Sequence, residues 1–163
     1  MKRLILALAA IALPFTASAS QQLASDWGIK ASGLYEDTVT LIEAIDTAGE
    51  TPIPHDYEVE IERFALAAGK LGSWIDGNDG PSDLGCIFRG MAEEGVVQLD
   101  ALYEAGSPAD TRASLVRLAT MFSDAEVIAV AAIHSSGHEA PAVSNIAAAS
   151  CPVSAAAAKA ALH

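Results

Sequence analysis

Two histidines four residues apart form the clearest metal-binding pattern in the chain. His134 and His138 are one helical turn apart, and Glu139 follows directly. A histidine pair on one face of a helix can hold a divalent cation while a carboxylate completes the ligand set. Gly137 favours a helix end between them, and the His-Glu-x-x-His order of a zinc protease is absent. A metal site and a solvated helix end therefore both stay open. Two further histidines could add ligands: His55 and His163.

The chain contains only two cysteines, Cys86 and Cys151. In an oxidising compartment they predict one disulfide, which would close a loop of about 65 residues and stabilise the fold by about 4 kcal/mol. Such a bridge could hold the alanine-rich end of the chain against the body. A redox-active pair is the alternative, but the Cys-x-x-Cys arrangement that tunes a reactive thiolate is absent.

A cluster of acidic residues surrounds one tyrosine. On a helix Asp56 and Glu60 share one side while Glu58 and Glu62 share another, so the four carboxylates flank Tyr57 without converging on one point. This arrangement suits a face turned toward water. It could also present a negative rim, with Tyr57 as an aromatic anchor, to a basic partner.

The sequence designates no catalytic group. It lacks a Gly-x-Ser-x-Gly elbow, a glycine loop that could cradle phosphate and a Cys-x-x-Cys-His haem site. Apart from a divalent metal, no cofactor is implied. A role without catalysis is favoured, although a helical bundle can host chemistry in its core.

The first nineteen residues have the features of a signal peptide. Lys2 and Arg3 give a positive start, an apolar run occupies residues 4–13, and Ala17-Ser18-Ala19 supplies a small-x-small cleavage pattern. The apolar run is too short to cross a hydrocarbon layer about 30 Å thick as a helix. We therefore expect cleavage near Ala19, a periplasmic or secreted product and no stable membrane anchor.

The remaining chain is strongly acidic. Lys2 and Arg3 leave with the leader, so seven of nine basic residues remain against 21 acidic ones, a formal charge of −14. A negative field of this size repels phosphate backbones and anionic lipid heads, which argues against nucleic acid and membrane-surface partners. A basic protein or a cation remains possible, and the charge could also serve solubility alone.

Apolar residues at steps of three, four and seven predict successive helices. Three of them span residues 23–48, 81–105 and 107–137, the last with a bend or a new start at Ser123. The segment 127–133 is apolar on all sides, as expected of an element surrounded by others. Residues 142–162 favour helix with an interruption at Pro152.

The segment 56–75 contains a conflict between two patterns. Residues 56–62 alternate polar and apolar side chains, which is typical of a strand. Apolar residues from Tyr57 to Ile75 nevertheless follow a four-three rhythm, which favours a helix over the whole segment. A first half in extended conformation is the alternative.

Together these patterns predict an all-α fold in which residues 20–163 form a single domain. We expect an irregular bundle of four to five helices, pinned by Cys86 and Cys151. The expected function is binding of a basic protein, as by an inhibitor, an immunity-type factor or an envelope accessory. A periplasmic metal-binding or metal-buffering protein is the alternative.

Overall fold

The computed structural model describes residues 15–78 and 80–135, which form four helices and no strand. In chain order they are α1 (Phe15–Ala48), α2 (His55–Gly77), α3 (Ser82–Glu104) and α4 (Pro108–Ser135). The expectation of an all-helical bundle is confirmed. The segment 142–162, with its expected interruption at Pro152, lies outside the described residues.

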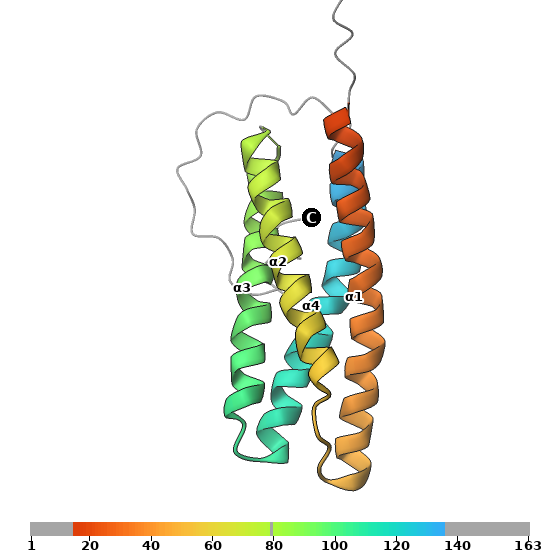
Figure 1. Cartoon of the computed structure of the whole chain (residues 1–163), viewed down its shortest axis with the longest axis vertical. Helices are drawn as coiled ribbons and strands as arrows, with labels where there is room; N and C mark the ends of the chain where they lie inside the picture. The colour runs from red at the N-terminus through yellow and green to blue at the C-terminus, as the bar shows by residue number, and fades with distance from the viewer. Residues whose placement is uncertain (1–14, 79, 136–163) are drawn as a thin grey trace, which may run out of the picture.

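The helices run alternately down and up, so that neighbours in sequence are antiparallel (Figure 1). α1 packs most closely along α4, and α2 packs most closely along α3. Contacts between α3 and α4 and between α1 and α2 close the ring, whereas the backbones of the diagonal pairs stay apart and these helices meet only through side chains in the core. The described part is therefore an up-and-down four-helix bundle, a more regular packing order than the sequence suggested.

The first helix ends where the sequence predicts. Gly49 adopts a positive φ of 80°, a conformation that costs glycine little. Its amide donates to the Ile45 carbonyl at 2.8 Å and so satisfies one of the last free carbonyls of α1. Two prolines in the connection, Pro52 and Pro54, precede the start of α2 at His55.

The second segment is helical from its first residue, so the strand alternative is wrong. The buried apolar residues of α2 keep the four-three spacing that was visible in the sequence: Tyr57, Ile61, Phe64, Ala68, Leu71 and Ile75. Burying this stripe along the whole length outweighs the local alternation of the first seven residues. The helix continues to Gly77, two residues beyond the predicted end.

The fourth helix is unbroken. Ser107 caps its start by accepting a hydrogen bond from the Asp110 amide at 3.2 Å, as the cap pattern predicts. No new helix starts at Ser123, because the buried stripe continues through Phe122 and Ala125. The expectation that segment 127–133 is surrounded on all sides is wrong, since Val127 and Val130 are 56% and 54% exposed.

One aromatic side chain from each helix meets the others in the core. Trp27 stacks on Phe64 with ring centroids 4.7 Å apart, and Phe88 meets the same indole edge-on at 5.0 Å. Phe122 packs edge-on against Phe64 at 5.0 Å. The buried Trp27 indole N–H donates to the Phe64 carbonyl at 3.1 Å. This cluster fixes the positions of all four helices relative to one another.

The predicted leader overlaps the described structure only at its end. α1 begins at Phe15 and passes through the predicted cleavage position near Ala19. The core residues of α1 start at Ala24, so cleavage there would leave the described core intact. Within the described residues, none of the helices has both the length and the apolar character that crossing a membrane requires.

Candidate functional site

The candidate metal ligands are only partly described. His134 is exposed on the last turn of α4, whereas His138, Glu139 and His163 lie outside the described residues. His55 starts α2 at the opposite end of the bundle, with its Nδ1 3.3 Å from Glu58 Oε2. Among residues 15–78 and 80–135, no group of three or more histidines, cysteines or carboxylates could hold a metal ion.

Cys86 is buried near the start of α3. Its expected partner Cys151 lies outside the described residues, so the disulfide stays a prediction.

Tyr57 is not the surface anchor that the acidic cluster suggested. Its side chain is 6% exposed, and its hydroxyl lies 2.7 Å from Thr38 Oγ1. Thr38 Oγ1 donates to the Leu34 carbonyl at 2.5 Å, so the Tyr57 hydroxyl donates to Thr38. Burial raises the pKa of Tyr57 well above its usual value. A partner cannot reach this ring, which instead joins α2 to α1.

The four carboxylates of the cluster divide into two groups. Glu60 faces α1, where Lys30 donates to it, and Arg63 adds an ion pair at 2.5 Å. These two cations hold the pKa of Glu60 below its usual value. Asp56 is exposed, and Glu58 and Glu62 face the side of α2 that packs against α3.

The aromatic side chain beside Glu58 and Glu62 is Tyr103, at the end of α3. It is 57% exposed. Partial burial and the negative charges of Glu58 and Glu62 raise its pKa. The site therefore holds an accessible aromatic ring next to carboxylates, but the ring comes from a helix that the sequence interpretation did not connect to the cluster.

A groove with a volume of about 650 Å³ begins at Glu62 and follows the seam between α2 and α3. Leu66 and Val96 stand on its two sides and are 61% and 51% exposed. Its lining is mostly apolar: Glu62, Ala65, Leu66, Gly69, Lys70, Ser73, Ala92 and Val96. We call this feature the α2–α3 groove.

A smaller groove of about 310 Å³ follows the other close helix pair, α1 and α4. Ile29 and Val130 stand on its sides and are 69% and 54% exposed. Its described lining has one charged residue, Glu126, and also includes Ser25, Gly28, Ile29, Ser32, Ala129, Val130 and Ile133. We call it the α1–α4 groove.

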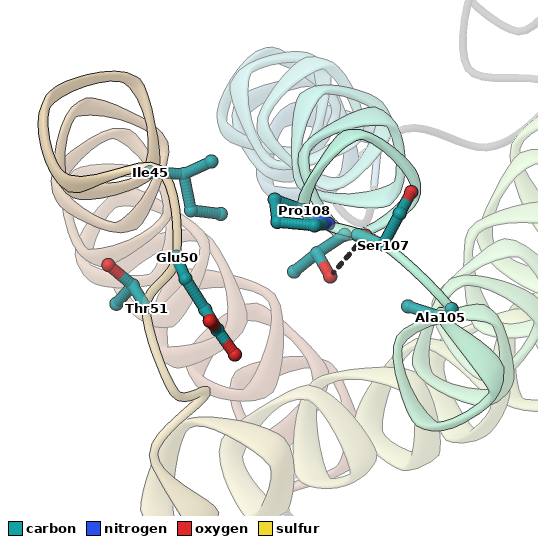
Figure 2. A pocket seen from close by; sticks show the side chains of 8 residues that line it. Ile45, Glu50, Thr51, Ala105, Ser107 and Pro108 are labelled. Carbon is teal, nitrogen blue, oxygen red and sulfur yellow. Dashed lines mark hydrogen bonds between the residues drawn. The ribbon is translucent and has the colours of Figure 1, made fainter.

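A third hollow, of about 210 Å³, lies at the end of the bundle where two connections meet. Glu50 extends into it from the connection between α1 and α2, opposite Ala105 and Pro108 (Figure 2). Among the described residues that line it, Glu50 is the only ionisable one.

The buried polar groups of the described part serve the structure. Glu94 accepts hydrogen bonds from Arg117 Nη2 at 2.6 Å and from Gln98 Nε2 at 3.1 Å, which ties α3 to α4. Within residues 15–78 and 80–135, no buried side-chain nitrogen or oxygen lacks a hydrogen-bond partner. No described polar group is therefore held unpaired in the core for a reaction.

Comparisons with protein-family models, curated proteins and solved structures find no match to this chain. Its function must therefore be argued from the grooves and charges of the bundle itself.

Proposed function

We propose that this protein is an exported factor without catalytic activity that binds a basic protein through its acidic surface. An inhibitor, an immunity-type factor and an envelope accessory would all act in this way. The supporting observation is that most basic side chains of the described bundle already pair with carboxylates of the protein itself.

Most cations of the described bundle are already neutralised. Five of its six Lys and Arg side chains pair with carboxylates: Lys30, Arg63, Arg89, Arg112 and Arg117. The remaining acidic side chains greatly outnumber the one basic side chain left, Lys70. The excess carboxylates project a negative field into solvent, which accelerates association with a positively charged partner and weakens as salt is added.

Export and the Cys86–Cys151 bridge belong to the same proposal. A compartment that oxidises thiols would stabilise the fold through the bridge, and the envelope or the exterior would supply the partner. The signal-like leader, residues 1–19, supports export from the cytoplasm.

Capture from an envelope extract tests the proposal. The mature protein is immobilised, and bound proteins are eluted with salt rising from about 0.05 M to about 0.5 M, across which the screening length shrinks several-fold. We expect a partner with a basic isoelectric point that is retained at low salt and released as salt rises. Capture of no protein, or of one that salt does not release, would count against the proposal.

Metal buffering is the second candidate, because His134 is exposed and accessible at the end of α4. Elemental analysis of untagged protein, compared with a variant carrying His134→Ala and His138→Ala, tests it. Metal that is present in the wild type and lost in the variant supports this candidate. Equal metal content in both proteins removes it.

A further inference from the structure

We propose that the α2–α3 groove binds a cationic amphipathic helix, whose apolar side chains pack between Leu66 and Val96 while its Lys or Arg side chains face Glu58, Glu62 and Asp100. The inference rests on the proposed function and specifies its surface and its partner class.

Small residues create the groove. A side chain added at Gly95 would lie 3.3 Å from Ala65, and one added at Gly69 would lie 3.9 Å from Ala92. The two helices therefore approach closely along this line, and the seam stays shallow between the projecting Leu66 and Val96. Exposed apolar side chains on both sides of a seam lined with small residues suit the apolar face of a third helix.

The negative charge at one end of the groove favours a partner with positive charge. Because α2 and α3 are antiparallel, Glu58 and Glu62 lie beside the last turns of α3, which carry Asp100 and Tyr103. Burial and the charges of Glu58, Glu62 and Asp100 raise the pKa of Tyr103, so three carboxylates lie close to this ring. Tyr103 is an exposed ring of the kind that often anchors an interface.

The α1–α4 groove lacks these features and provides a control. It has exposed apolar side chains, Ile29 and Val130, and about half the volume. Among the described residues, its lining has one charged side chain, Glu126, whereas the lining of the α2–α3 groove has Glu62 and Lys70. The α2–α3 groove differs in the group of carboxylates at one end, where Glu62 lies with Glu58 and Asp100 around Tyr103. If exposed apolar surface alone attracted the partner, both grooves would bind it. If the combination of apolar surface and carboxylates is required, only the α2–α3 groove will.

The first test uses a synthetic helical peptide with leucine on one face and lysine on the other, and a second peptide with glutamate in place of lysine. Binding of the mature protein to each fluorescein-labelled peptide is followed by anisotropy at low salt. We expect the lysine peptide to bind and the glutamate peptide not to bind. Equal binding of both peptides, or failure of the lysine peptide to bind, would overturn the inference.

The second test locates the binding surface. Leu66→Gln with Val96→Thr should weaken binding of the lysine peptide about tenfold, because it removes the central apolar contacts. The matched pair Ile29→Gln with Val130→Thr, in the α1–α4 groove, should change it less than about twofold. Circular dichroism confirms that each variant is folded. Equal losses in the two pairs would contradict the assignment of the groove.

The third test distinguishes binding at the α2–α3 groove from attraction by the overall negative charge of the protein. Two double variants each remove two exposed carboxylates. The first carries Glu62→Gln and Asp100→Asn, beside the groove. The second carries Glu36→Gln and Glu43→Gln, on α1. Only the first pair should weaken binding severalfold and flatten its salt dependence. If both pairs act equally, the groove is rejected while binding through the general acidic surface stands. If an extract yields a basic partner but the lysine peptide does not bind, the proposed function also survives without the groove.

Discussion

At the scale of single residues, four aromatic rings decide how the helices meet. Trp27, Phe64, Phe88 and Phe122 each come from a different helix, and none is more than 1% exposed. The sequence places each ring on a buried stripe, yet it gives no information on which stripe faces which. Contacts between rings arise from tertiary packing, which periodicity along one helix does not encode.

Removing one of these rings should cost much of the stability. We expect Phe122→Ala to lower the free energy of unfolding by about 3–5 kcal/mol, because it leaves a cavity at the junction of the helices. Val127→Ala, an exposed position on the same helix, should change it by less than about 0.5 kcal/mol. Urea unfolding followed by circular dichroism measures both, and similar values for the two variants would contradict this view of the core.

Replacing the buried Tyr57 with phenylalanine should change both the stability of the protein and the dependence of that stability on pH. At neutral pH, Tyr57→Phe should cost about 0.5–1.5 kcal/mol, the net value of a typical hydrogen bond. Burial raises the pKa of Tyr57 in the folded protein, so above about pH 10 the unfolded chain loses a proton that the folded protein keeps. Wild-type stability should therefore fall as pH rises past this value.

Unfolding curves at about pH 9 and pH 11, on either side of the ordinary tyrosine pKa, compare the two proteins. The decline should be shallower in Tyr57→Phe. Tyr35→Phe, at an exposed position on α1, should decline as the wild type does. A Tyr57→Phe variant whose stability falls as steeply as that of the wild type would show that the buried ring does not cause the alkaline loss.

At the scale of elements, close contact between α1 and α4 depends on a single glycine. A Cβ added at Gly28 would lie 2.7 Å from the Ala129 Cβ, whereas one added at Gly33 would meet nothing within 4 Å. Both glycines lie in the same helix, so they share the same intrinsic helix cost and differ only in their tertiary surroundings.

Replacing the two glycines should therefore have opposite effects. Gly33→Ala should raise stability by about 0.5–1 kcal/mol, the helix preference for alanine. Gly28→Ala should lower it, because α1 and α4 must separate, and Gly28→Ala with Ala129→Gly should restore most of the loss. Thermal unfolding measures all three variants. A stabilising Gly28→Ala would contradict the close packing of these helices.

How far the sequence predicted the elements depends on what each pattern encodes. The spacing from Tyr57 to Ile75 predicted α2 correctly because a buried stripe repeats with the helix period. The cap-like residues at Ser123 suggested a bend or a new helix start, and no new helix starts there, because a local preference yields to a continuous buried face. The exposure of Val127 and Val130 could not be predicted without knowing that α1 and α3, the neighbours of α4, leave part of it uncovered.

The candidate site, too, could be predicted only in part from the sequence. Composition shows the acidic character, and the helix spacing predicts that Glu58 and Glu62 lie on a different side of α2 from Glu60, which contacts Lys30 of α1. Tyr57 is buried and Tyr103 is exposed, which the sequence could not show because it depends on how α2 packs against α1 and α3. A single exposed apolar residue such as Leu66 or Val96 is common on protein surfaces and carries no signal by itself.

For the whole molecule, the expected disulfide can be tested through the effect of reduction on stability. Cys86 and Cys151 should be joined in protein taken from the exported fraction, and reduction should lower the free energy of unfolding by about 2–4 kcal/mol. Cys151→Ala should unfold identically with and without reductant. Two thiols reactive in the unreduced, denatured protein would contradict the bridge.

Photo-crosslinking in producing cells can show which groove contacts the partner. A photoreactive amino acid replaces Val96 in the α2–α3 groove or, as the control, Ile29 in the α1–α4 groove, both of which are exposed. We predict an adduct with a basic protein outside the cytoplasm at position 96 that is absent at position 29, identified by mass spectrometry. An adduct with an acidic partner, or equal yields at the two positions, would contradict recognition through the carboxylate-flanked groove.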